Sequence, residues 1–151
     1  MPQIQPSGKP LRVVADGNRQ VTIQKVHTPR GERLQFDASA TDESIRLDAV
    51  ALESVTWQES SEMADRAATV ERTTTTVERA PSEVDELMIA NEYGQVQLER
   101  VDDDAVHLRA PKLGHEITLD VDELEWLTVQ DHETFTTFLE QPFGPEDHDH
   151  H

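Results

Sequence analysis

A fourteen-residue stretch occurs twice in this chain, and the duplication is the strongest constraint on its fold. Residues 45–58 read IRLDAVALESVTWQ and residues 117–130 read ITLDVDELEWLTVQ, so the two stretches lie 72 positions apart. Seven of the fourteen positions are identical: Ile45/Ile117, Leu47/Leu119, Asp48/Asp120, Leu52/Leu124, Glu53/Glu125, Thr56/Thr128 and Gln58/Gln130. Identity of this density predicts that one structural unit is present in two copies.

The repeat extends toward the N-terminus with a small change of offset. Residues 86–101 align with residues 11–26 at an offset of 75, and three fewer residues in the next loop convert that offset to 72. The apolar pairs brought into register are Ala15/Ala90, Val21/Val96, Ile23/Leu98, Val26/Val101, Leu34/Val106, Phe36/Leu108 and Ala38/Ala110. We therefore predict a first copy at 11–68 and a second copy at 86–141.

Alternating apolar residues predict that each copy consists mainly of short strands. Leu11, Val13 and Ala15 alternate before the turn sequence at 16–18, and an Asp-Gly pair in that position is a strong hairpin signal. The same alternation continues at Val21, Ile23, Leu34, Phe36, Ala38, Ile45 and Leu47. It breaks at 48–53, where we predict one helical turn before a fifth strand at 55–57.

A short helix is predicted to follow the fifth strand of each copy. Residues 59–68 fit a helix that is capped by a serine and that buries Met63 and Ala67. In the second copy Asp131 is placed to cap the helix, and one helix face carries Phe135, Phe138 and Leu139.

Two segments fit more than one structure. Residues 82–91 fit helical spacing, but the repeat favours a strand at 87–90. The threonine-rich residues 69–85 form either an edge strand or a solvated connector, because four consecutive β-branched threonines disfavour a helix.

The predicted fold is mainly β, with an internally duplicated five-stranded barrel-like unit, each copy followed by a short helix. The strand pattern resembles that of small SH3-like and Sm-like barrels, and this resemblance implies a fold and no activity. A unit of about 48 residues buries little core by itself. We therefore expect the copies to share a core or pack tightly, with Trp57, Trp126 and the C-terminal phenylalanines at the seam. A single ten-stranded sandwich or barrel is the alternative.

Two further segments flank the copies. Residues 1–10 contain three prolines and are predicted to be a flexible N-terminal segment. Residues 142–151 are predicted to be an acidic tail that contains histidines.

Acidic residues dominate the charge of the chain. There are 31 Asp and Glu residues against 13 Lys and Arg residues, which gives a formal net charge of -18. Such an acidic protein is typical of a salt-loving cytoplasm, where a Debye length of about 3 Å in molar salt screens the repulsion. A nucleic-acid partner is not expected, because phosphate binding needs a basic stripe.

Composition also excludes several classes of protein. The chain has no cysteine, so disulfides, thiolate catalysis and cysteine-based metal sites are excluded. It contains neither a secretory signal pattern nor an apolar run of membrane-spanning length. We expect a cytoplasmic protein with no membrane partner.

One dense cluster of potential metal ligands is visible in the sequence. The tail ends in Glu-Asp-His-Asp-His-His, and His148, His150 and His151 are the candidate ligands for a divalent transition metal. The competing interpretation is an acidic tail with adventitious affinity, because six consecutive residues do not preorganise a closed site.

The other candidate chemical groups have simpler structural interpretations. The acidic run 102–104 suits a solvated turn better than a calcium loop, since it lacks the spaced ligands and the glycine. Asp48 and Asp120 each precede a predicted helical turn, where an aspartate caps free backbone N–H groups. His27, His107 and His115 have no neighbours that suggest a catalytic triad.

The first function we infer is a non-catalytic interaction or regulatory module with a protein partner and no cofactor. The second is a divalent metal-binding protein that uses the histidine tail. The third is a small-barrel binder of single-stranded nucleic acid. That third function requires a face of arginine and aromatic side chains, which the sequence does not assemble from Arg12, Arg33, Arg46, Arg100 and Arg109.

Overall fold

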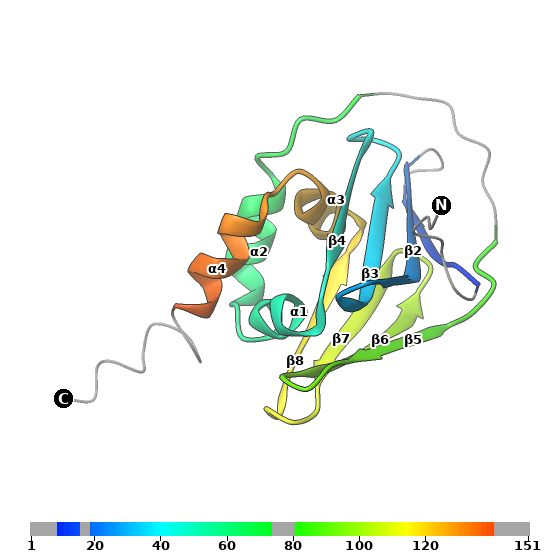
Figure 1. Ribbon diagram of the computed structural model, residues 1–151. Coiled ribbons are helices and arrows are strands. Elements are labelled where there is room, and N and C mark those ends of the chain that lie inside the picture. The colour runs from blue at the N-terminus through cyan, green and yellow to red at the C-terminus, as the bar shows by residue number, and fades with distance from the viewer. Residues whose placement is uncertain (1–8, 16–18, 74–80, 141–151) are drawn as a thin grey trace.

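The computed structural model contains two four-stranded antiparallel sheets, each followed by two short helices (Figure 1). It describes residues 9–15, 19–73 and 81–140. The first copy contains β1 (Leu11–Ala15), β2 (Arg19–Thr28), β3 (Gly31–Ala38), β4 (Glu43–Leu47), α1 (Ala49–Thr56) and α2 (Ser60–Ala67). The second contains β5 (Glu86–Ala90), β6 (Gln95–Asp102), β7 (Ala105–Ala110), β8 (His115–Asp120), α3 (Val121–Thr128) and α4 (His132–Leu139).

Both sheets are simple meanders in which neighbouring strands along the chain are paired. Side chains alternate between a buried inner face and an exposed outer face, as the sequence pattern predicts. The strand predicted at 87–90 is confirmed as part of β5.

The predicted offset of 75 is wrong for the first strand of each copy. Val13 pairs with Val21, whereas Ile89 pairs with Val96, so β1 and β5 correspond at an offset of 76. The second copy has one residue fewer between these paired positions, and the buried side chains follow the ladder.

The predicted fifth strand is also wrong, because residues 55–57 complete a helix. Asp48 begins α1 by accepting a hydrogen bond from the N–H of Ala51 at 2.8 Å. Asp120 begins α3 through a capping box with Glu123. The β-branched residues at the end of α1 suggested a strand, but the aspartate cap and the burial of nearly the whole helix favour helix.

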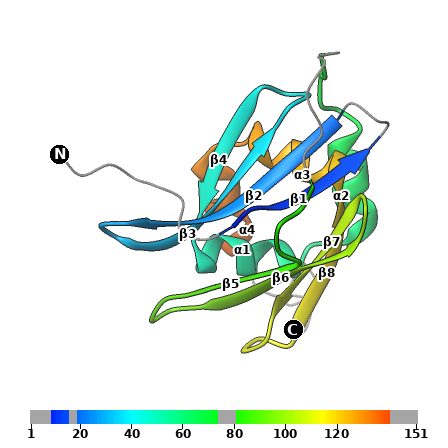
Figure 2. The same cartoon turned by 90° about the vertical axis from the view of Figure 1, so that its right-hand side faces the viewer.

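No closed barrel is formed by the strands in the described ranges, and both sheets are open. The structure is instead two sheets with helices between and beside them (Figure 2). The SH3-like and Sm-like strand pattern is therefore not confirmed, because four strands end in two helices in each copy.

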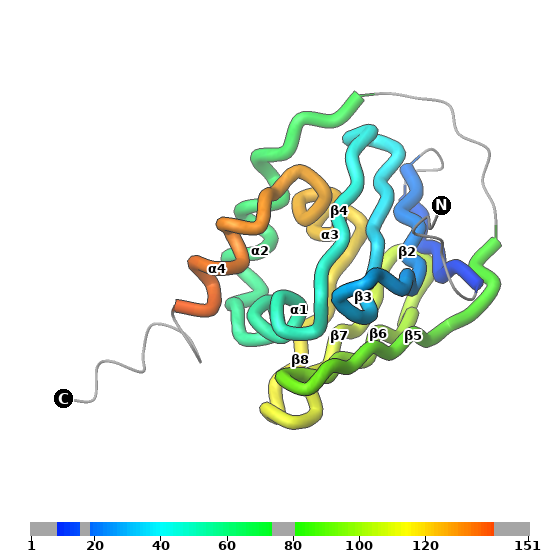
Figure 3. Tube along the Cα trace, in the orientation of Figure 1, coloured from blue at the N-terminus to red at the C-terminus, as the bar shows by residue number. Residues whose placement is uncertain are grey.

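The two copies share one core because each contributes a helix to the other. α1 of the first copy packs against β6, β7 and β8 of the second. α3 of the second copy packs in turn against the sheet β1–β4 of the first, and the chain path of this exchange is visible in Figure 3. Leu52 and Leu124, the repeated leucines, are both fully buried in a single hydrophobic cluster.

The remaining helices close the shared core at one end. α2 packs on α3 and α4 packs on α1, so each helix pair joins the two copies. The indole N–H of Trp57 donates to the carbonyl of Phe138 at 3.3 Å, and Trp126 stacks on Phe138. The predicted seam of tryptophans and phenylalanines is confirmed.

The helix that buries Met63 and Ala67 is confirmed, but its cap differs from the prediction. Glu59 occupies the N-cap position of α2, and no side-chain hydrogen bond caps this helix. Asp131 does cap α4, by accepting from the N–H groups of Glu133 and Thr134. No helix among the described residues is long and apolar enough to cross a membrane.

Candidate anion-binding site

The residues predicted to hold a metal lie outside the described part of the chain. His148, His150 and His151 belong to residues 141–151, so that hypothesis stays a prediction. Within the described ranges, no group of three or more His, Asp or Glu side chains is positioned to hold a metal ion.

The other sequence candidates have structural roles. Asp48 and Asp120 are helix caps, as predicted. The 102–104 run forms an exposed turn, in which Asp103 contacts Arg100 at 3.4 Å. His107 contacts Glu116 at 2.7 Å on the outer face of the second sheet.

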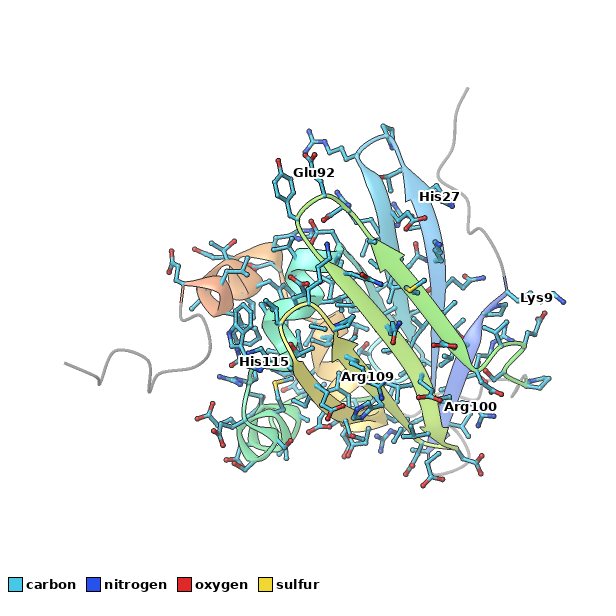
Figure 4. All side chains as sticks on the ribbon, turned by 90° about the horizontal axis from the view of Figure 1, so that it is seen from below. Lys9, His27, Glu92, Arg100, Arg109 and His115 are labelled. Atoms are coloured by element: carbon cyan, nitrogen blue, oxygen red, sulfur yellow. The ribbon has the colours of Figure 1, made fainter. Side chains whose placement is uncertain are left out.

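Most arginines of this acidic protein are neutralised by carboxylates. Six described arginines form ion pairs with Asp or Glu: Arg12, Arg19, Arg66, Arg72, Arg100 and Arg109. Two of them, Arg100 and Arg109, lie on the second sheet (Figure 4). The other arginines in the described ranges are Arg30, Arg33 and Arg46, and no ion pair joins any of them to a carboxylate of the described residues.

These three arginines line a single concave surface. A hollow of about 380 Å³ is lined by Thr28, Arg30, Arg33, Arg46, Asp48, Ala51 and His132. An adjoining hollow of about 430 Å³ is lined by Gln35, Ser44, Ile45, Arg46, Gln130 and His132. Arg46 and His132 belong to both hollows, so we treat them as one site and call it the arginine trough.

The β2–β3 hairpin places the first two arginines. Thr28 pairs with Gly31 across a two-residue turn, and Gly31 has a φ of 120°, which only glycine adopts without strain. The Thr28 hydroxyl accepts from the N–H of Arg30 at 3.1 Å and donates to the carbonyl of Gly31 at 2.9 Å. This turn holds the backbone of Arg30 close to Arg33 on the following strand.

Strand β4 and the start of α4 supply the rest of the trough. Arg46 lies opposite Gln35 in the ladder, and its Nε donates to the Gln35 side-chain oxygen at 2.7 Å. Its other guanidinium N–H groups have no partner among the described residues. His132 is the first residue of α4, directly after the cap Asp131.

The trough has more positive than negative charge although the chain is strongly acidic. Asp48 is the one carboxylate that lines these two hollows, and it is already engaged as the cap of α1. A third hollow adjoins the trough at Ser44 and is lined by Asp37, Asp42 and Glu43, so the excess of positive charge lies at the Arg46 end. Arg30 and Arg46 are exposed and Arg33 is half-buried. Guanidinium groups in such a hollow are suited to hold carboxylate or phosphate groups through paired hydrogen bonds.

A second set of ionisable residues lies in the shared core and is structural. Glu125 is fully buried and pairs with Arg19 at 3.1 Å and with Arg72. Its repeat equivalent Glu53 instead accepts from the N–H of Gln95 at 3.0 Å, and burial raises its pKa. A Cβ on Gly94 would lie 2.7 Å from Glu53 Oε1, so a side chain at this position would displace the Glu53 carboxylate.

Sequence reasoning assembled only part of this site. The sequence offers Arg33 and Arg46 as candidates for a cationic face and gives no signal for Arg30 or His132. The alternation pattern could have placed Arg46 beside Gln35, because each of them lies between two buried apolar residues on adjacent strands. The position of His132 beside Arg46 depends on how α4 packs in the folded chain, and no local sequence pattern predicts that packing.

Comparisons with protein-family models, with curated proteins and with solved structures found no match to this chain.

Proposed function

We propose that this protein is a non-catalytic binding module whose arginine trough holds an anionic group of a partner. One observation carries the proposal. In a chain with net charge -18, the three described arginines without a carboxylate partner all line the same concave surface. Intramolecular pairing would be the default for arginines surrounded by so many acids, so their shared location supports a role in binding.

The lining residues favour binding over catalysis. Ser44 and His132 both line the trough, but no hydrogen bond joins them in the described structure. A nucleophilic hydroxyl needs a base within hydrogen-bonding distance, and that contact is not formed. We therefore propose no enzymatic activity for this site.

The chemistry of the trough also ranks the partners. Single-stranded nucleic acid is usually held by aromatic side chains that stack on the bases. The described lining contains no Phe, Tyr or Trp. The tail hypothesis of metal binding concerns other residues and stays a separate prediction.

The test uses an N-terminally labelled peptide of alternating Glu and Val, and a matched peptide of alternating Gln and Val. Fluorescence anisotropy at low salt measures both affinities for the full chain. We expect the Glu peptide to bind and the Gln peptide not to bind. Salt should weaken the binding, because exposed charges are screened.

The matched variants are Arg33→Gln with Arg46→Gln in one protein, and Arg109→Gln in another. Arg109 lies on the outer face of the second sheet and already pairs with Glu116, so it is the control. We expect the double variant to lose at least about tenfold in affinity, since charge-assisted pairs contribute about 1.5–3 kcal/mol each. Equal binding by all three proteins would contradict the proposal, provided that circular dichroism shows each one folded.

A further inference from the structure

We propose that the partner is an extended acidic segment of another protein, which adds to the free edge of β4 as an antiparallel fifth strand. This inference rests on the proposed function and specifies how the trough is occupied. It joins two features of the same surface, an open sheet edge and a group of arginines beside it.

The backbone of β4 has hydrogen-bonding groups that face away from the sheet. The N–H of Ser39 donates to the carbonyl of Gln20. The backbone groups of every second residue before Ser39 in β3 therefore also point toward β2. Because the pattern alternates in antiparallel ladders, Leu34 and Phe36 face β4, and they pair with Leu47 and Ile45. Ser44 and Arg46 therefore direct their N–H and C=O groups toward the free edge.

That edge forms one wall of the trough. Three consecutive residues of β4 line the hollow, Ser44, Ile45 and Arg46, and Ile45 does so although the residue is only 8% exposed. The opposite wall is formed by Gln130 and His132 at the junction of α3 and α4. A segment lying in this hollow would meet the free backbone groups of β4 along its length.

The first strands of the two sheets have edges that the chain itself covers. On β1, the N–H of Arg12 donates to the Ser82 hydroxyl and the N–H of Val14 donates to the carbonyl of Asp103. On β5, the N–H of Ala90 donates to the carboxylate of Glu32. No such contact is formed between described residues at Ser44 or Arg46, and an open edge is a template for an added strand.

The positive charge of the arginines beside β4 favours an acidic segment at this edge. In an antiparallel pair, the residues opposite Ser44 and Arg46 have their side chains on the same outer face, where Arg33 and Arg46 lie. A carboxylate opposite Arg46 would meet its guanidinium group directly. A carboxylate opposite Ser44 would meet the same group diagonally, with Asp37 on the far side of Ser44. The intervening residues point to the helical side of the sheet, where neutral side chains are required. An acid–neutral–acid pattern over about five residues matches the length of β4.

The last strand of the second sheet provides a comparison inside the same molecule. β8 is the repeat equivalent of β4 and is also the final strand of its sheet. At the position of Ser44 it carries Glu116, which pairs with His107 and Arg109. An acidic segment is repelled there, so the proposal assigns the binding to β4.

The first experiment separates strand addition from simple charge attraction. The Glu–Val peptide is made in two N-methylated forms, one methylated at the glutamates and one at the valines. Antiparallel addition directs the glutamate N–H groups to β4 and the valine N–H groups to solvent. We expect the glutamate-methylated peptide to lose at least about tenfold in affinity and the valine-methylated peptide to bind within about twofold of the parent.

The second experiment changes the edge and leaves the arginines. Ser44→Pro removes one edge-facing donor without removing a hydrogen bond to β3. Thr118→Pro, at the repeat equivalent of Arg46, is the control change on β8. We expect Ser44→Pro to lower the affinity for the peptide and to leave the lower affinity for inorganic phosphate unchanged. Thr118→Pro should change neither affinity. Thermal unfolding verifies that both proteins are folded.

The outcomes separate the two proposals. If both methylated peptides bind equally well and the arginine double variant loses affinity, the strand-addition proposal is contradicted and the anion-binding proposal stands. Failure of the parent peptide to bind would overturn both. Binding of single-stranded oligonucleotide in place of the peptide would also overturn strand addition, since a nucleic-acid backbone has no peptide N–H groups.

Discussion

The β2–β3 hairpin of the first copy and the β6–β7 hairpin of the second occupy equivalent places in the fold and carry opposite charge. The first contains Arg30 and Arg33 and helps to form the arginine trough. The second contains the exposed acidic turn at 102–104. The two hairpins share buried residues on the inner face of their sheets and differ where the side chains meet solvent or a partner.

This difference shows which positions the fold constrains. Buried leucines, helix-capping aspartates and buried glutamates recur in both copies because packing and capping require them. The outer-face positions have diverged, so that Glu116 neutralises Arg109 in one copy while Ser44 leaves Arg46 without a carboxylate in the other. A shared framework therefore supports one face that is internally paired and one whose described arginines lack carboxylate partners, and the second is the face that we propose binds anions.

The largest expected effect tests whether the two copies contribute equally to the shared core. Leu52→Ala and Leu124→Ala each remove a fully buried side chain from a helix that packs on the other copy's sheet. We expect each to lower the free energy of unfolding by about 2–5 kcal/mol. Urea denaturation should show one cooperative transition in both variants. Two separate transitions would contradict a shared core.

The repeated glutamates should respond differently to the same substitution. Glu125→Gln removes the buried carboxylate that holds Arg19 and Arg72, and we expect a loss of about 3 kcal/mol of stability. Glu53→Gln keeps an oxygen that accepts from the N–H of Gln95. It also removes a carboxyl group whose pKa is raised by burial. Its stability at pH 8 should equal or exceed that of the natural chain. Equal losses in both variants would show that the environments are equivalent.

Glu123 should add a pH dependence of stability that has no counterpart at the equivalent position of the first copy, which is Ala51. Burial, reinforced by the nearby Asp120 and Asp122, raises the pKa of Glu123 to about 7, while the N–H of Asp120 opposes this shift. Between pH 4.5 and pH 7 the folded protein therefore binds more protons than the unfolded chain. Stability should fall as pH rises through this window, by at most about 3 kcal/mol.

The control for this pH effect is Glu123→Gln, which keeps an acceptor for the N–H of Asp120. Urea denaturation between pH 5 and pH 8 should show a smaller decline in this variant than in the natural chain. A decline of the same size in both proteins would exclude Glu123 as its source.

The smallest expected effect exchanges the outer-face residues between the copies. Ser44→Glu places beside Arg46 the carboxylate that Glu116 supplies in the second copy, where it lies 2.7 Å from His107. We expect about a tenfold loss of affinity for the acidic peptide, which corresponds to about 1.4 kcal/mol. Unfolding should be nearly unchanged, because exposed ion pairs contribute little to stability. Unaltered affinity would exclude Ser44 from the binding surface.

Local patterns predicted the parts of the fold that local physics controls. Alternation predicted the strands that begin at Leu11 and Glu86, and helical spacing predicted the helix that buries Met63. The same reasoning was wrong at residues 55–57, because β-branched residues favour a strand locally while an aspartate cap and burial on several sides favour a helix. The salt-loving habitat, the domain boundaries and the metal-binding tail stay predictions.

The sequence by itself determined that this protein is mainly β and strongly acidic, that a fourteen-residue stretch recurs in it, and that aspartates cap α1, α3 and α4. These properties follow from periodicity, composition and residues a few positions apart. Only the tertiary structure decided that each copy packs a helix on the other copy's sheet, and that Arg30, Arg33 and Arg46 meet His132. The physical reason is that both arrangements depend on contacts between segments far apart in the chain, and neither leaves a periodic signal within any one segment.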